Sequence, residues 1–181
     1  ANIQNRLNYS SVVLDARGNV ISAANPDEPR FPASLTKMMT LYMLFEAMRD
    51  GRVRPETRIA MSAEASSRPP SKLGVPAGYS LELEDAILAV VTRSANDVAT
   101  AIGEHLGGSE ERFAQMMTQR ARSLGMTRTT FRNASGLPDP EQTTTARDMA
   151  TLGRRLMEDF PTQYRYFATT QFRWNNRPIH N

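Results

Sequence analysis

The sequence contains no cysteine, which excludes disulfide bridges, thiol catalysis and cysteine-ligated metal sites. Histidine is also scarce, with only His105 and His180 in 181 residues. Neither histidine lies in an HExxH-like segment, and no GxSxG sequence occurs. A Ser-His-Asp triad would need one of these two histidines, so histidine-based hydrolytic sites have little support.

Long apolar runs are missing as well. Residues 38–48 are mostly apolar, but they are too few to cross a membrane and Glu46 interrupts them. The chain begins at Ala1 with no initiator methionine and no signal-like segment, which would suit a processed chain. The net charge of +3 comes from scattered basic residues without interleaved aromatic residues, so we expect no nucleic-acid partner.

The composition that remains is that of an ordinary soluble globular protein, with 40% apolar and 23% charged residues. Hairpins are predicted near both ends, and we expect their strands to meet in one sheet. The first hairpin joins residues 11–15 to 20–23 through Ala16–Asn19, and the second joins 172–174 to 178–180 through Asn175–Arg177. Residues 52–80 look irregular, with Pro69, Pro70 and Gly74 as breaks.

Helices are predicted between these hairpins. The first begins near residue 32 and ends near Gly51, and four more cover about 81–92, 96–106, 109–124 and 146–160. Each of these four follows a residue type that caps helix N-termini. The expected caps are Ser80, Ser94, Ser109 and Thr145.

The first helix has an unusual start, because Ser34 and Lys37 stand one turn apart at the head of an otherwise apolar helix. If Pro32 takes the first helical position, Ser34 lies in the first turn with its own N–H free to donate elsewhere. The serine would then supply both an oxygen nucleophile and one donor for an oxyanion. A lysine three residues later lies on the same face of the helix.

Burial of this helix would make Lys37 a base. A low-dielectric environment disfavours the ammonium form and lowers the lysine pKa, and a neutral lysine beside a serine can accept its proton. Lys37 and Lys72 are the only lysines in a chain whose other basic residues are all arginine. Arginine cannot be deprotonated in a protein, so it could not replace Lys37 in this role. A structural interpretation stays open, because serine is common at helix starts and buried lysines extend to solvent.

A second group, Ser94-Ala95-Asn96, lies at a predicted junction between two helices. Alone it is weak, because Ser94 with Asp97 three residues later also fits a helix-capping box. An SxxK sequence followed about sixty residues later by SxN in a helical region is much rarer. Together they resemble the first two motifs of the penicillin-recognising serine enzymes.

Longer stretches extend this resemblance from about residue 10 to the end of the chain. They are "PASLTKMMT", "PPSKLGVPAG", "VTRSANDVATAIGEHLGGSEERF", "FRNASGLPDPEQTTTARDMATL" and "FRWNNRPIHN". The chain resembles the D-alanyl-D-alanine carboxypeptidases among the low-molecular-mass penicillin-binding proteins, which are serine peptidases. Asn133-Ala134-Ser135 is formally a glycosylation sequon, but in a bacterial family we interpret it as a turn.

The resemblance implies a role for each matching residue. Ser34 matches the acylated nucleophile, Lys37 the base that activates it, Ser94 a proton relay, and Asn96 a residue that binds substrate. The substrate would be a peptidoglycan stem peptide ending in D-Ala-D-Ala, and β-lactams would be covalent inhibitors. No metal or cofactor is implied. The family acts in the periplasm or on the outer face of the cytoplasmic membrane.

The resemblance also implies the fold. We expect an α/β (α+β) protein with the penicillin-binding-protein and β-lactamase-like transpeptidase fold, mostly helical in this chain and with an incomplete antiparallel sheet. Residues 1–181 would form one incomplete catalytic domain. Its sheet-bearing lobe would cover about 1–61 and 136–181, and its helical lobe about 62–135.

One motif of the family is missing. No Lys-Thr-Gly occurs, since Lys72 is followed by Leu73-Gly74. In the family this motif lies on a strand after the region where this chain stops, so we expect a truncated and poorly active piece. Its exposed sheet edge could pair with another chain. Any membrane attachment would need segments that this sequence does not contain.

Two alternatives remain at this point. A β-lactamase of the same superfamily would need an added base for deacylation, and no Glu-x-x-Leu-Asn segment is present. A non-catalytic fragment or a cell-wall-binding relative would keep the fold without the chemistry. Turnover of a β-lactam would identify the first, and peptidoglycan binding without D-alanine release would identify the second.

Overall fold

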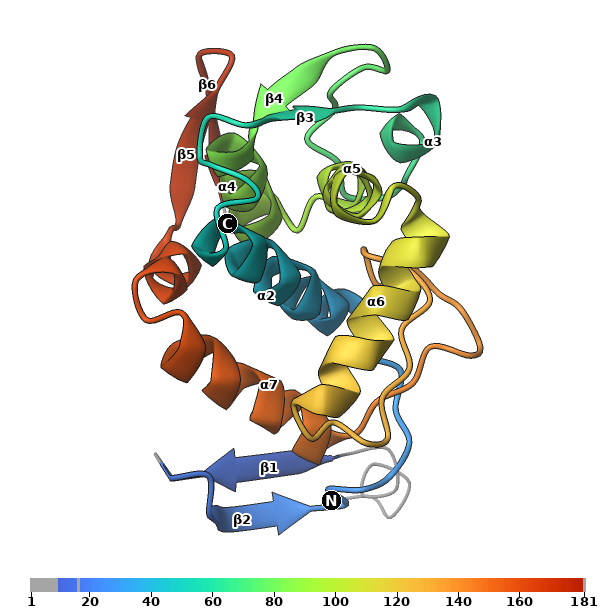
Figure 1. Cartoon of the computed structure of the whole chain (residues 1–181), viewed down its shortest axis with the longest axis vertical. Helices are drawn as coiled ribbons and strands as arrows, with labels where there is room; N and C mark the ends of the chain where they lie inside the picture. Colours follow the sequence, from blue (N-terminus) through green and yellow to red (C-terminus); the bar gives the residue numbers. More distant parts are fainter. Residues whose placement is uncertain (1–9, 16, 181) are drawn as a thin grey trace.

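The structure is a computed structural model, and it describes residues 10–15 and 17–180. Ala16, in the first predicted turn, and Asn181 lie outside the described residues. One buried helix, α2 (Thr36–Arg49), runs through the middle of the molecule, and the other long helices pack around it (Figure 1). Ten of its 14 residues are buried, as expected for an apolar helix that passes through a core.

The helices that surround α2 agree with the sequence predictions to within about two residues. The long ones are α4 (Leu83–Arg93), α5 (Asn96–Gly107), α6 (Glu110–Ser123) and α7 (Ala146–Asp159). Shorter elements are η1 (Ala33–Leu35), α3 (Ala63–Ser66) and η2 (Gln163–Ala168). Their apolar faces converge on α2, and the aromatic side chains of Tyr42, Phe45 and Phe160 pack edge to face within that core.

The strands form three separate antiparallel pairs among the described residues. These pairs are β1 (Ser11–Leu14) with β2 (Val20–Ala24), β3 (Arg58–Ala60) with β4 (Ser80–Glu82), and β5 (Gln171–Trp174) with β6 (Arg177–His180). Both terminal hairpins are therefore confirmed, and β3–β4 was not predicted. The expected meeting of the two terminal hairpins does not occur in this part of the chain. They lie at opposite ends of the molecule because β1 packs on α7, whereas β5 and β6 pack on α4 (Figure 1).

Two of the four predicted caps are confirmed. The Ser109 hydroxyl accepts a hydrogen bond from the N–H of Arg112, and the Thr145 hydroxyl accepts one from the N–H of Asp148. The predictions for Ser80 and Ser94 are wrong. Ser80 belongs to β4, and Ser94 is the left-handed residue that ends α4.

We expect Ser109→Ala to lower the free energy of unfolding by about 1 kcal/mol, because the first turn of α6 loses its side-chain acceptor. Chemical denaturation of the purified chain measures this change. Ser123→Ala at the other end of α6 is the comparison, since its exposed hydroxyl caps no helix N-terminus. Equal effects of the two substitutions would show that the cap contributes nothing particular.

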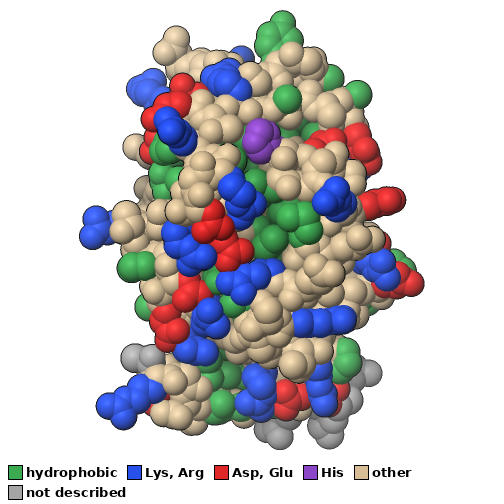
Figure 2. Space-filling view, in the orientation of Figure 1, with side chains coloured by type: hydrophobic (Ala, Val, Ile, Leu, Met, Phe, Trp, Pro, Cys, Tyr) green, Lys and Arg blue, Asp and Glu red, His purple; other side chains and the backbone are tan. Residues whose placement is uncertain are grey.

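A polar network fixes α2 relative to α6 and α7. The buried Tyr42 hydroxyl donates to Asp159 on α7 at 2.6 Å, and the guanidinium of Arg120 on α6 binds Glu46 on α2 at 2.7 Å. Burial and the Asp159 carboxylate raise the pKa of Tyr42 to about 12, so its hydroxyl stays a donor at neutral pH. On the face of the molecule that Figure 2 shows, in the orientation of Figure 1, acidic and basic side chains lie interleaved.

Candidate active site

Ser34 lies in the single turn of 3₁₀-helix, η1, that leads directly into α2. Pro32 precedes that turn instead of opening the α-helix as expected, and its carbonyl accepts the N–H of Leu35 at 3.0 Å. Ser34 is exposed, and its N–H donates no hydrogen bond within the described part of the chain. A nucleophilic oxygen and an available N–H donor therefore come from one accessible residue.

Backbone strain marks both sequence motifs. Ala33 has a φ of 48° and Ser94 a φ of 52°, both in the left-handed region. They are the two residues other than glycine and asparagine with positive φ among the described residues. This conformation costs a residue with a side chain about 1–2 kcal/mol, and such strain gathers at functional sites. One strained residue precedes Ser34, and the other is itself a candidate.

Lys37 is buried, with 5% of its surface exposed. Its Nζ donates to the backbone carbonyl of Ser135 at 2.7 Å, and no carboxylate among the described residues pairs with it. Burial lowers the pKa of Lys37 to about 8, from the usual 10.5. A substantial fraction of this side chain is therefore a neutral amine just above physiological pH, which a base requires.

The segment 133–136 was not predicted to belong to the site, yet it packs along α2 beside both candidates. Its carbonyls accept from Lys37 and, at Ala134, from the hydroxyl of Thr40 at 2.7 Å. Gly136 touches the backbone before Ser34 so closely that an added Cβ would lie 1.8 Å from the Ala33 carbonyl oxygen. The interpretation of this segment as a turn is correct locally, because the Asn133 side chain accepts the N–H of Gly136. No local pattern reveals its position against α2.

The second motif lies at the junction of α4 and α5. Ser94 is half-buried, and its N–H donates to the carbonyl of Val90. The capping-box alternative for Ser94 and Asp97 is wrong, because Ala95 is the N-cap residue of α5, whereas Ser94 is the C-cap residue of α4. Asn96 is buried at 5% exposure, and its Nδ2 donates to the carbonyl of Pro69 at 2.8 Å.

No hydrogen bond within the described residues joins Ser34, Lys37, Ser94 and Asn96 with one another. The helical spacing predicts that the polar side-chain atoms of Ser34 and Lys37 lie within hydrogen-bond reach of each other and of Ser94 or Asn96. In the described residues the Lys37 ammonium donates to the Ser135 carbonyl instead. A backbone carbonyl is a good acceptor for an ammonium group, and a neutral amine would be held less strongly. The joint action of the four residues stays a prediction.

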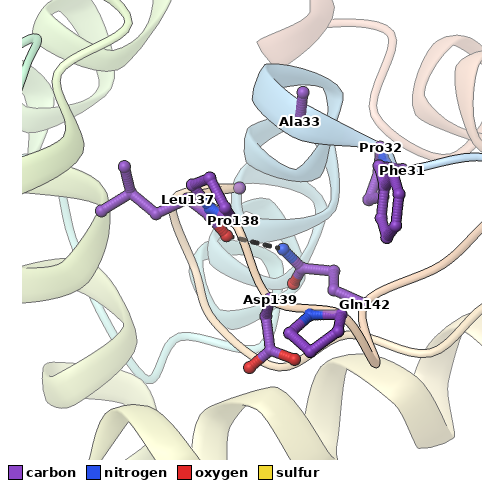
Figure 3. Close-up of a pocket in the computed structure, with 9 residues that line it drawn as sticks. Phe31, Pro32, Ala33, Leu137, Pro138, Asp139 and Gln142 are labelled. Carbon is purple, nitrogen blue, oxygen red and sulfur yellow. Dashed lines mark hydrogen bonds between the residues drawn. The ribbon is translucent and has the colours of Figure 1, made fainter.

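Two recesses border the segment 133–139. One, of about 310 Å³, is mainly apolar and adjoins the backbone before Ser34 (Figure 3). In it Gln142 donates to the carbonyl of Leu137, opposite the 70% exposed ring of Phe31. The other recess, of about 450 Å³, is polar, and its lining includes Glu64, Arg68 and Ser135.

Candidate metal sites and candidate membrane spans are both absent from the residues that the structure describes. No group of three histidine, aspartate or glutamate side chains in this part of the chain could hold a metal ion. None of its helices combines the length and the apolar character needed to cross a membrane.

Comparisons with known proteins show which family this chain resembles. The D-alanyl-D-alanine carboxypeptidase family matches residues 6–181. D-alanyl-D-alanine carboxypeptidase DacC of Escherichia coli is 34% identical over 91% of this chain and 43% of its own length. DacA of Haemophilus influenzae is 32% identical over 87% of this chain and 41% of its own length. The chain thus spans about two fifths of the length of these relatives.

Solved structures agree with the sequence comparison. DacD from Francisella tularensis matches with a TM-score of 0.89 and 37% identity, over 92% of this chain and 41% of that protein. Penicillin-binding protein 5 from Haemophilus influenzae matches with a TM-score of 0.90 and 30% identity, over 95% of this chain and 51% of that protein. The expected penicillin-binding-protein fold, mostly helical with small antiparallel sheets, is confirmed. This chain belongs to the D-alanyl-D-alanine carboxypeptidase family.

Proposed function

We propose that the protein is a serine-type D-Ala-D-Ala carboxypeptidase that acts on peptidoglycan stem peptides. Ser34 Oγ attacks the carbonyl carbon of the terminal peptide bond and loses its proton to neutral Lys37. The C–N bond then breaks, Ser94 passes the proton to the departing amine, and D-alanine leaves. Water hydrolyses the resulting ester and restores the Ser34 hydroxyl. Asn96 binds the substrate backbone.

The buried Lys37 is the observation that supports this mechanism best. Its pKa is lowered to about 8 by burial, and it follows an exposed serine by one helical turn. A lysine with only a structural role would gain nothing from a site that destabilises its charge. Family membership supports this reaction, and the buried environment supports Lys37 as its base.

β-Lactams are the proposed covalent inhibitors, because their strained amide resembles the bond that Ser34 would attack. Penicillin-binding protein D2 of Listeria monocytogenes, a protein of the same fold, has been solved with cefotaxime bound. We further propose that the protein acts in the periplasm or at the outer face of the cytoplasmic membrane, where its substrate is found.

The missing Lys-Thr-Gly limits what residues 1–181 could do alone. In the family that motif holds the substrate carboxylate and provides a second oxyanion donor. Loss of one such donor typically costs about 10²–10³ in rate. We therefore propose that residues 1–181 by themselves acylate poorly, and that the edges of the hairpins can pair with a further strand.

The test compares residues 1–181 with the natural full-length protein. Each is incubated with penicillin, and the intact mass and the release of D-alanine from a pentapeptide are followed. We expect a covalent adduct at Ser34 and D-alanine release in the full-length protein, both absent after Ser34→Ala. A full-length protein that neither forms the adduct nor releases D-alanine would contradict the proposal. Rapid β-lactam turnover would instead identify a β-lactamase.

Acylation should increase with pH through about 8, because only neutral Lys37 accepts a proton and its pKa lies there. With that pKa, the neutral fraction at about pH 6 is roughly a hundredfold below its plateau, and the rate should fall with it. The measurement is the rate of adduct formation between about pH 5.5 and 9.5. Circular dichroism at each pH controls for unfolding. A flat rate profile would show that Lys37 is not the base.

A further inference from the structure

A buried carboxylate that the proposed mechanism does not use lies beside the second motif. Asp97 follows Asn96 on α5 and has 0% of its surface exposed. Its oxygens accept three hydrogen bonds, from the N–H groups of Leu73, Gly74 and Val98, at 2.9–3.0 Å. None of these donors is a cation. Burying a carboxylate costs free energy unless such hydrogen bonds stabilise it, and these three N–H groups provide them.

Two of these donors belong to the segment 69–74, which crosses the start of α5. The same segment also binds Asn96, since the Asn96 N–H donates to the carbonyl of Ser71 at 2.7 Å and Nδ2 donates to that of Pro69 at 2.8 Å. Four hydrogen bonds therefore hold the segment 69–74 against two adjacent residues. Two of the four end on the Asp97 carboxylate.

This arrangement orients the Asn96 side chain. Because Nδ2 is engaged by Pro69, the amide cannot rotate to exchange its two ends without losing that bond. Its Oδ1 accepts no hydrogen bond from any described residue, so it is available as an acceptor. A substrate N–H or the Lys37 ammonium is the chemical group that such an acceptor suits.

We propose that Asp97 is a positioning residue for this site: it anchors the segment 69–74, which in turn holds the Asn96 amide with its oxygen available to the substrate. This inference rests on the proposed function for its catalytic consequence. The anchoring itself is a property of the fold and can be tested independently of activity.

Asp97→Asn tests the anchoring. An amide keeps one acceptor oxygen, but its NH₂ group faces an N–H donor and cannot bind it. Hydrogen bonds to a charged group contribute about 1.5–3 kcal/mol, so amide exchange in the segment 69–74 should become at least about tenfold faster. Exchange measured by mass spectrometry on the folded chain gives this ratio.

Acylation by penicillin in the natural full-length protein tests the consequence. The acylation rate at saturating penicillin should fall at least about tenfold in Asp97→Asn, with little change in the half-saturating concentration. The reason is that Asn96 orients the reacting bond and adds little binding area. Asp148→Asn is the matched control. Asp148 is also a buried carboxylate, and it accepts from the N–H of Arg128 and the hydroxyl of Thr129, far along the chain from the segment 69–74.

We expect Asp148→Asn to lower stability while leaving both the acylation rate and exchange in the segment 69–74 unchanged. Faster exchange with full acylation in Asp97→Asn would overturn the positioning role, as would slower acylation without faster exchange. If Asp97→Asn does not fold, exchange in the unsubstituted protein decides: unprotected amides at Leu73 and Gly74 would refute the anchor. A parent that penicillin never acylates would refute the proposed function, and the exchange ratio would still decide the anchor.

Discussion

Lys37→Arg should reduce acylation of Ser34 by penicillin by about 10²–10⁴ in the natural full-length protein, the usual effect of losing a general base. An arginine side chain keeps the positive charge and can still donate to the Ser135 carbonyl. It cannot be deprotonated at any pH at which the protein folds, so it cannot accept the serine proton. Stopped-flow or mass-spectrometric measurement of adduct formation gives the rate.

Lys72→Arg is the matched control, because Lys72 is the only other lysine and its Nζ also donates to a backbone carbonyl, that of Ser66 at 3.0 Å. An arginine at this position can also donate to the Ser66 carbonyl, and the bonds from the segment 69–74 to Asn96 and Asp97 use backbone atoms of other residues. We therefore expect this substitution to leave the acylation rate close to that of the parent. An unchanged rate in Lys37→Arg would show that the buried lysine is structural. Thermal unfolding of both variants separates loss of the base from loss of the fold.

Gly136→Ala should be among the most damaging single substitutions in the chain, with a loss of roughly 2–4 kcal/mol in the free energy of unfolding. The added Cβ would lie 1.8 Å from the Ala33 carbonyl oxygen, and the backbone φ of +87° disfavours any side chain. Relief of the overlap must move the peptide that carries Ser34. We therefore expect acylation to fall even in the molecules that remain folded. Urea denaturation and penicillin labelling measure the two effects.

Gly125→Ala separates the two causes. Gly125 also has a positive φ, +97°, but nothing lies within 4 Å of its would-be Cβ. This variant should lose only the backbone part, about 1–2 kcal/mol, and should keep its acylation rate. Equal losses of stability in the two variants would mean that the contact between Gly136 and Ala33 adjusts without cost.

Local patterns were sufficient for the long helices and for the terminal hairpins. Asn175 and Asn176 both have positive φ, as a two-residue hairpin turn requires, and asparagine tolerates this conformation well. The pair β3–β4 escaped prediction because each strand has three residues and its partner lies 22 positions away. Strands this short carry no alternating pattern, and their pairing depends on the helices around them.

In the candidate site, too, local spacing predicted some features, whereas contacts between distant segments could not be predicted. The relation of Ser34 to Lys37 follows from helical spacing, and the effect of burial on the Lys37 pKa follows from the apolar residues after it. The Ser135 carbonyl that accepts a hydrogen bond from Lys37 could not be predicted. Every residue has a backbone carbonyl, so the sequence does not mark the one that serves as acceptor. Asp97 was misinterpreted for a related reason: its spacing from Ser94 fits a cap, but two of its three donors lie in another segment.

The contact between Lys37 and Ser135 joins residues 98 positions apart, and Thr40 and Ala134 are 94 apart. The chain is synthesised from its N-terminus, so the ribosome releases α2 well before the segment that will cover Lys37. At about 5–20 residues per second this delay lasts roughly five to twenty seconds. Throughout it the Lys37 ammonium is hydrated and Ser34 has no activated neighbour. A nascent chain that ends before Ala134 therefore carries the SxxK motif but not the environment that makes it reactive.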